Sequence, residues 1–291
     1  MKKLLLILLC LPMIGFGQVT MIPDAIFEQR LIDLGYDNGV PNGSVYTVAI
    51  DTVTYLSVSN LNITDLTGIE DFIALTELRC SNNNLTSLDV SQNTALTELI
   101  CRINQITSLD VSTNTALTYL RCNDNPLTSL DVSANTALTE LHCFYNQLTS
   151  LDVSNNTALA YLLCGHNQLT SLDVSNNTAL FSFFCNNNNQ LTSLDVRNGN
   201  NTNMPYFNAL DNPNLTCIDV DDVFYSTTIW ADIDPQHYFS TNCPPSAIQE
   251  LTINKELLKI TDLLGGETKQ TNQPLFYIYD DGTVEKRIVI E

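Results

Sequence analysis

Lysine is absent between Gln18 and Ser246, and the basic residues of that stretch are five arginines: Arg30, Arg79, Arg102, Arg121 and Arg197. The whole chain of 291 residues has a formal charge of −20. A surface this acidic repels the phosphate backbone of nucleic acids, so it argues against nucleic acid as a partner. The plainest interpretation of the acidity is that it keeps the protein in solution.

Long apolar runs are also scarce, and the one marked run lies in the opening letters MKKLLLILLCLPMIGFGQ. Two lysines, a short apolar stretch and small residues are typical of a secretory signal peptide, which we place at residues 1–17 with cleavage after Gly17. Cys10 is compatible with a lipoprotein signal, but Leu8 and Leu9 stand where that signal needs small residues. No later segment approaches the ~20 apolar residues of a membrane helix, so we expect no membrane span in the mature chain.

Cysteine, in contrast, recurs at a fixed spacing of 21 residues, at Cys80, Cys101, Cys122, Cys143, Cys164 and Cys185. The unit LTELRCSNNNLTSLDVSQNTA, which begins at Leu75, is the first of five regular copies, and less regular copies flank them. The pattern LxxLxLxxNxL with cysteine at position six resembles the leucine-rich repeat family. That resemblance implies a solenoid of about eight repeats of 21–22 residues over 53–220. Its curved parallel sheet would lie on the concave side, with turns and loops on the convex side.

Positions one, four and six of each repeat are apolar and are predicted to point into the solenoid. The cysteines at position six have apolar neighbours and lie in a column, whereas a metal site needs several ligands that converge on one point. We therefore interpret them as buried thiols rather than as a metal array or a redox device. The asparagines at position nine are predicted to turn inward and bond stranded backbone groups: Asn83, Asn104, Asn125, Asn146 and Asn167.

An aspartate recurs just before a turn in each repeat, at Asp89, Asp110, Asp131, Asp152, Asp173 and Asp195. Carboxylates at this spacing are compatible with calcium, which takes six to eight oxygen ligands. Nothing else in the motif supplies further carboxylates, so turn capping is the favoured interpretation. The sequence predicts neither a metal nor a cofactor.

The repeats differ from one another mainly at positions two, three, five, seven and eight, which we expect to face outward on the concave sheet. These positions gather three arginines, two histidines and several aromatics, the residue types that dominate binding hot spots. Random drift of unselected positions is the alternative, but drift would not be expected to collect rare cations and aromatics on one face. The predicted ligand-binding residues are Arg79, Arg102, Ile103, Tyr119, Arg121, His142, Phe144, Tyr145, Tyr161, Leu163, His166 and Phe184.

Caps are expected at both ends, because a solenoid otherwise exposes its core. The segment 18–52 contains PDAIFEQRLIDLG, predicted to be a helix with Phe27, Leu31 and Leu34 on one face. The segment 217–243 is rich in aromatics. Cys217 and Cys243 at its ends are expected to form a disulfide in an exported protein.

The last part of the chain, 247–291, reads as strands around an Asp-Gly hairpin signal. It resembles the C-terminal sorting domain of the type IX secretion system of Bacteroidetes. The matching residues are Lys259, Ile260, Asp262, Leu264, Gly265, Glu267, Tyr277, Tyr279, Asp281, Gly282, Val284, Lys286 and Ile288. The resemblance implies a small antiparallel β-sandwich that is recognised by the type IX secretion machinery and removed during export across the outer membrane. The mature protein would then be secreted or held at the cell surface.

Together these patterns predict an exported, non-enzymatic recognition or adhesion protein that binds a protein or glycan on its concave face. No nucleophile elbow, phosphate loop or metal-ligand spacing accompanies the histidines, so catalysis is not expected. The alternative is a structural component of the surface or matrix that self-associates, with or without calcium.

Overall fold

The computed structural model describes residues 17–244, 257–261, 274–279 and 284–288. All of the expected signal peptide except Gly17 lies outside the described residues, as do Asp262, Gly265, Asp281 and Gly282 of the expected sorting signal. The chain divides into two compact units, Met1–Pro244 and Pro245–Glu291.

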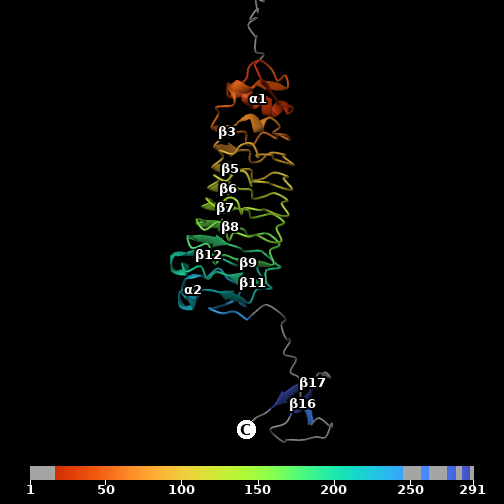
Figure 1. Cartoon of the computed structure of the whole chain (residues 1–291), viewed down its shortest axis with the longest axis vertical. Coiled ribbons are helices and arrows are strands. Elements are labelled where there is room, and N and C mark those ends of the chain that lie inside the picture. Colours follow the sequence, from red (N-terminus) through yellow and green to blue (C-terminus); the bar gives the residue numbers. More distant parts are fainter. Residues whose placement is uncertain (1–16, 245–256, 262–273, 280–283, 289–291) are drawn as a thin grey trace, which may run out of the picture. The chain divides into compact units, whose positions relative to one another are not determined.

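The first unit is a solenoid whose main sheet has eight parallel strands in the order β12-β10-β8-β7-β6-β5-β4-β3 (Figure 1). Each strand has three residues and lies in direct register with the next, so that Leu78 stands beside Leu99 and Leu99 beside Leu120. The strands are β3 (Tyr55–Ser57), β4 (Glu77–Arg79), β5 (Glu98–Ile100), β6 (Tyr119–Arg121), β7 (Glu140–His142), β8 (Tyr161–Leu163), β10 (Ser182–Phe184) and β12 (Tyr206–Asn208).

The predicted leucine-rich repeat solenoid is confirmed, with about nine turns rather than about eight. The additional turn was missed because it runs through the C-terminal cap, where a parallel bridge joins Asn208 to Asp232 and the leucine pattern is lost. The core is a continuous column of leucines and cysteines from positions one, four and six. Leu75, Leu78 and Cys80 of the first regular unit are fully buried.

The asparagines at position nine bond the backbone of two turns at once. Asn125 donates from Nδ2 to the carbonyls of Cys101 and Cys122, and its Oδ1 accepts from the backbone N–H of Ile106 at 3.0 Å. The same arrangement recurs at Asn83, Asn104, Asn146 and Asn167. It also extends to Asn188 and Asn212, which sequence reasoning missed because the repeats there are irregular.

A second column of asparagines lies on the return side of the turns, at Asn93, Asn114, Asn135, Asn156 and Asn177. These side chains are fully buried, and Asn114 donates to the carbonyls of Val90 and Asn93 of the preceding turn. This second column therefore also links neighbouring turns.

The expectation of turns and loops alone on the convex side was wrong for the C-terminal half of the solenoid. There a second parallel sheet forms in the order β14-β13-β11-β9, from β9 (Ser171–Asp173), β11 (Ser193–Asp195), β13 (Cys217–Asp219) and β14 (Tyr238–Ser240). The letters SLDV occur in every regular repeat, so local propensity does not decide this pairing. Contact with neighbouring turns does, as when Val174 donates to the carbonyl of Asp195.

The N-terminal cap combines a two-stranded antiparallel sheet, β1 (Val19–Met21) and β2 (Ser44–Tyr46), with helix α1 (Ala25–Asp33). Asp24 caps the helix by accepting from the N–H groups of Ile26 and Phe27, and its other oxygen accepts from Thr64 of the first turn. Three short 3₁₀ helices also occur in this unit: Thr47–Ala49, Ile69–Asp71 and Asn201–Asn203.

The predicted apolar face of this helix is correct for Phe27 and Leu31, which are fully buried, but wrong for Leu34. Leu34 is 36% exposed because the helix ends at Asp33. Leu34 is the C-cap residue: its backbone is still in the right-handed helical region, and its N–H donates to the carbonyl of Arg30.

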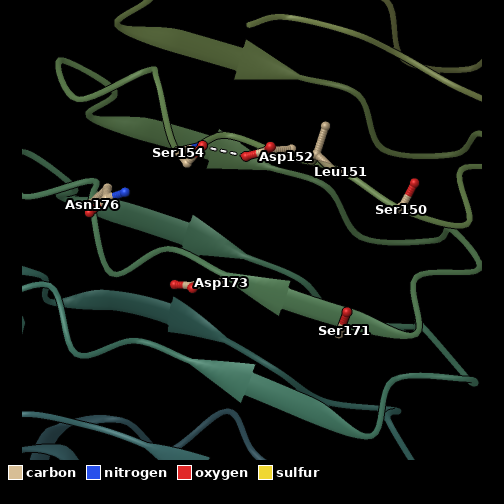
Figure 2. Close-up of a pocket in the computed structure, with 7 residues that line it drawn as sticks. All are labelled: Ser150, Leu151, Asp152, Ser154, Ser171, Asp173 and Asn176. Carbon is tan, nitrogen blue, oxygen red and sulfur yellow. Dashed lines mark hydrogen bonds between the residues drawn. The ribbon is translucent and has the colours of Figure 1, made fainter.

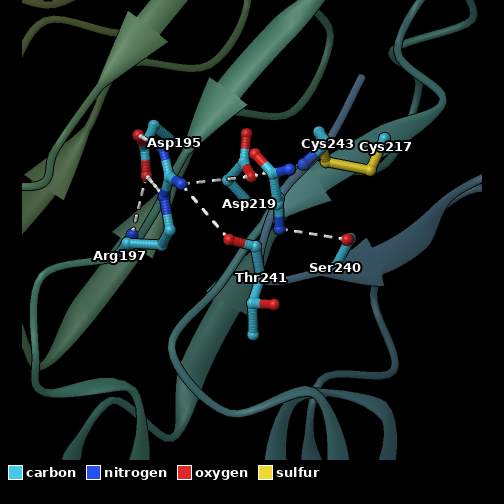
Figure 3. The surroundings of a disulfide bond; sticks show 8 residues. Asp195, Arg197, Cys217, Asp219, Ser240, Thr241 and Cys243 are labelled. Carbon is cyan, nitrogen blue, oxygen red and sulfur yellow. Dashed lines mark hydrogen bonds and ion pairs between the residues drawn. A yellow bond between two sulfur atoms is a disulfide. The ribbon is translucent and has the colours of Figure 1, made fainter. Parts of the chain in front are cut away.

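The C-terminal cap contains helix α2 (Val223–Ile229), capped by Asp222, and a cluster of aromatic rings that closes the core. Trp230 stacks on Phe207 at 4.3 Å and donates from Nε1 to the carbonyl of Met204. A disulfide joins Cys217 to Cys243, whose Cα atoms are 5.7 Å apart (Figure 3). Beside it, Arg197 donates to Asp195 and to the carbonyl of Thr241, so this arginine holds the end of the cap to the sheet.

The described part of the second unit is an antiparallel sheet of three strands, β15 (Leu257–Thr261), β16 (Pro274–Tyr279) and β17 (Val284–Ile288). The middle strand, β16, pairs with both others, and Ile278 of β16 stands opposite Val284 of β17. The described residues of this unit form one sheet, so the second sheet of the expected β-sandwich stays a prediction.

Candidate ligand-binding face

The outward face of the main sheet carries the predicted binding residues in adjacent rows. Residues of a strand alternate between the core and the outside, so a buried leucine at position four leaves positions three and five facing out. The register then aligns position five across the sheet, in the order Arg79, Ile100, Arg121, His142, Leu163 and Phe184. Tyr119 and Tyr161 lie at position three, on either side of Glu140.

Position eight has a left-handed backbone in each of six successive turns. The φ angles lie between 52° and 58° at Asn82, Ile103, Asp124, Tyr145, His166 and Asn187. Asparagine and aspartate tolerate this conformation, whereas a β-branched residue such as Ile103 is strained in it. Ile103 and Tyr145 are nevertheless 41% and 51% exposed, so burial does not compensate for the strain. Strain that no packing repays is a mark of functional positions.

A hollow of about 400 Å³ lies over the N-terminal strands of this face. We call it the basic hollow, and its lining residues are Ser59, Asn60, Arg79, Ser81, Asn82, Ile100, Arg102, Ile103 and Arg121. Arg79 is paired with Glu77. Arg121 places its guanidinium 4.8 Å from the centre of the Tyr119 ring, a cation–π contact. Within the described residues neither Arg102 nor Arg121 takes part in a salt bridge.

A smaller hollow of about 210 Å³ lies over β7, β8 and β10 and is mainly apolar. We call it the aromatic hollow, and Phe144, Tyr145, Leu163, Gly165, His166, Phe184 and Asn186 line it. Its wall is rigid because Tyr145 stacks on His166 at 4.0 Å and meets Phe144 edge-on at 5.7 Å. His142 lies between the residues of the two hollows. Its ring is 6.0 Å from that of Tyr119, which contacts Arg121, and 6.4 Å from that of Phe144.

The environment of His142 does not suit proton transfer near neutral pH. Burial, with a smaller contribution from the charge of Arg121, lowers its pKa to about 4. Glu140 would act in the opposite direction, but its Oε2 lies 3.7 Å from Nε2, beyond hydrogen-bond distance, and burial outweighs it. The imidazole is therefore neutral at pH 7 and serves as a flat packing surface.

Comparison with solved structures shows the same fold in two internalins of Listeria monocytogenes. Internalin C2 superposes with a TM-score of 0.58 and 18% identity, over 77% of this chain and 97% of that one. Internalin F superposes with a TM-score of 0.56 and 22% identity, over 75% of this chain and 68% of that one. The chain has the leucine-rich repeat fold of the internalins.

At the level of sequence, the internalin likeness is strong but short. A segment of 43 residues is 54% identical to Internalin J of Listeria monocytogenes serotype 4b (strain F2365). It makes up 15% of this chain and 5% of Internalin J, so the match spans a small part of that relative. No family model matches the chain.

One part of the predicted outward face of this leucine-rich repeat chain was wrong. Position seven was expected to point outward throughout, but Ser81, Asn123 and Gly165 are buried. This position begins the turn and packs against the next repeat, as when Ser81 Oγ donates to the carbonyl of Ile100. Arg102 is exposed at this position, and Phe144 and Asn186 are partly exposed.

A second aromatic row on the same leucine-rich repeat sheet was not predicted as a binding site beyond Tyr161. Phe181 meets Tyr161 edge-on at 5.9 Å and Tyr206 at 5.4 Å, and all three rings are exposed. A signal was present, since Phe181 stands at position two, where the five preceding regular units have threonine or alanine. Tyr206 gave no signal, because it falls in an irregular repeat.

The recurring aspartates of the repeats accept local backbone bonds, as the turn-capping interpretation expects. Asp152 Oδ1 accepts from the N–H of Ser154 at 2.9 Å, and Asp173 from Ser175 at 2.8 Å. A hollow of about 340 Å³ lies between these two carboxylates, lined also by Ser150, Ser171 and Asn176 (Figure 2). Among the residues that the structure describes, no three His, Cys, Asp or Glu side chains gather as a metal site.

Proposed function

We propose that this chain is an exported recognition or adhesion module that binds a protein or glycan through the concave sheet face and performs no catalysis. The observation that carries the proposal is position eight, where Ile103 and Tyr145 keep strained backbones and exposed apolar side chains. A scaffold that served only stability would favour asparagine there, as at Asn82 and Asn187.

The surroundings of position eight support the same role. Tyrosine, phenylalanine and arginine are the side chains that most often supply the binding energy of an interface. Here they form two adjoining hollows on one rigid sheet.

Among the described residues, no helix is long and apolar enough to cross a membrane.

The test is a screen of surface proteins and glycans with the purified chain beside a variant in which Arg102, Arg121, Phe144 and Tyr145 are alanine. We expect the variant to lose capture of any ligand that the original chain captures, with little change in melting temperature. The matched control replaces four exposed threonines of the same repeats outside the concave sheet: Thr86, Thr107, Thr128 and Thr149. Equal capture by both variants and the original chain would refute the proposal.

We also propose that residues 247–291 route the chain through type IX secretion. The support is the match of Lys259, Val284 and Lys286, among others, to the sorting pattern, together with the antiparallel pairing of the strands that carry them. In a bacterium that has this secretion system, a chain that ends at Pro244 should stay in the periplasm while the full chain reaches the surface or medium. Equal export of both would contradict this role.

A further inference from the structure

The basic hollow stands out because of what does not line it. The chain has 32 aspartates and glutamates against 12 lysines and arginines, yet none of the nine lining residues is acidic and three are arginines. Three acidic side chains lie close to the hollow without lining it. Glu77 pairs with Arg79, Glu98 stands at position three of β5, and Asp124 stands at position eight of the turn after Ile103. This hollow is therefore a local site for negative charge on an otherwise acidic protein.

Two of the three arginines are available for a ligand. Arg79 already pairs with Glu77, whereas Arg102 is exposed and has no salt bridge within the described residues. Arg121 is held in place by its contact with Tyr119 and takes part in no salt bridge among the described residues. A carboxylate between Arg102 and Arg121 would supply acceptors for both, and arginine binds carboxylates in a bidentate way.

The aromatic hollow adds a second requirement at a defined distance. Arg121, His142 and Leu163 are register neighbours on three successive strands. Strands lie ~4.8 Å apart, so Arg121, at the edge of the basic hollow, and Leu163, in the aromatic hollow, are about 10 Å from each other along the sheet. An extended peptide advances ~3.3 Å per residue, so this separation corresponds to about three residues.

From this geometry we propose that the concave face binds an acidic peptide segment in which an aspartate or glutamate occupies the basic hollow. A large apolar side chain about three residues away occupies the aromatic hollow. A polyanionic glycan fits less well, because it has no apolar group for Phe144, Leu163 and Phe184. Its remaining charges would also lie over the acidic rest of the protein. This inference rests on the proposed function and narrows it to one class of ligand.

The experiment is a selection of phage-displayed random heptapeptides on the full chain, followed by titration of the enriched synthetic peptides. We expect enrichment of Asp or Glu with Phe, Tyr, Trp or Leu three residues away. Arg102→Gln and Arg121→Gln should each weaken binding of these peptides at least ~10-fold, as for hot-spot arginines. Arg197→Gln removes the same charge outside the main sheet and should leave the affinity within about twofold, since rim and remote charges contribute little.

The outcomes separate this inference from the proposed function. Peptides that lose binding in Phe144→Ala but show no acidic preference would overturn the acidic-peptide proposal and leave the concave face as the binding surface. Peptides insensitive to all concave-face replacements would overturn both. If no acidic peptides are enriched and dextran sulfate binds in an Arg121-dependent way, the acidic-peptide proposal is overturned. The ligand is then an anionic glycan.

Discussion

The imidazole of His166 stacks on the ring of Tyr145, with the ring centroids 4.0 Å apart and the planes 17° from parallel. Both residues occupy position eight of successive turns, and both have a φ of 52°. The repeat backbone, rather than the side chains, therefore brings the two rings together, and their contact fixes one wall of the aromatic hollow.

Replacement of Ile103 by asparagine should stabilise the chain. Its φ of 55° is unfavourable for a β-branched residue, and its exposed side chain contributes little to the core. We expect the free energy of unfolding in urea to rise by about 1 kcal/mol. The reverse change at the equivalent position, Asn82→Ile, should lower it by a similar amount. A fall in stability for Ile103→Asn would show that position eight is not strained.

Removal of one ladder asparagine should be costly. Asn125→Ala leaves the N–H of Ile106 without its partner in the core. It also removes one of the two asparagine donors to each of the carbonyls of Cys101 and Cys122. We expect a loss of about 2–4 kcal/mol in the free energy of unfolding. The neighbouring Asn84 has an exposed side chain, and Asn84→Ala should stay within about 0.5 kcal/mol. Similar losses in the two variants would refute the assigned role of the ladder.

The sequence predicted the features that depend on the repeat and missed those that depend on its exceptions. The inward leucines, cysteines and position-nine asparagines follow from a strict period, because each turn repeats the same contacts. The ninth turn, Asn188 and Tyr206 fall where the pattern breaks, so no period could place them. The strain at Ile103 was also hidden, because single letters do not reveal the sign of φ.

The sequence predicted which face carries the candidate binding residues, but it did not predict that they form two separate hollows. The sequence alone showed that arginines and aromatic residues are grouped at the outward positions of the repeat. The separation into a basic and an aromatic hollow depends on which side chains are covered by the next turn. That depends on packing, as the buried Ser81 and Asn123 show.

The free energy of unfolding should fall as the pH is lowered from about 6.5 to about 4, because of the titration of His142. Its pKa falls from 6.5 when unfolded to about 4 when folded, so above about pH 6.5 the stabilising difference is fully present. Between pH 6.5 and 4 the unfolded chain gains a proton that the folded chain does not, and stability is lost. Urea titrations at several pH values should show wild type losing about 1–2 kcal/mol more than His142→Gln over this window.

The aspartates give an independent reference in this pH series. Hydrogen bonds from Ser91 hold the pKa of Asp89 below its ordinary value of 3.8, so its contribution is lost only at lower pH. Parallel curves for wild type and His142→Gln between pH 6.5 and 4 would show that His142 is not held neutral.

The six cysteines of the column should be unreactive in the folded chain. All are buried, and burial raises the pKa of each thiol, to about 12 for Cys101 and Cys185. Iodoacetamide at pH 8 should therefore leave them unmodified by mass spectrometry for hours, and should modify all six in guanidinium chloride. Cys217 and Cys243, joined in the disulfide, should react only after reduction. Rapid labelling of any column thiol under native conditions would contradict its burial.

The side-chain hydrogen bonds of Asn125 join its own turn to the preceding turn and to no other. Insertion or removal of a whole repeat therefore disturbs only the contacts at the new junction. Loss or duplication of 21 residues would bring together two turns that already present matching partners, with the core column and both asparagine columns continuous across the new junction. The solenoid can thus change length by whole repeats without a new fold. A gene of this kind can lengthen or shorten the display surface by unequal recombination, while the caps at its two ends stay as they are.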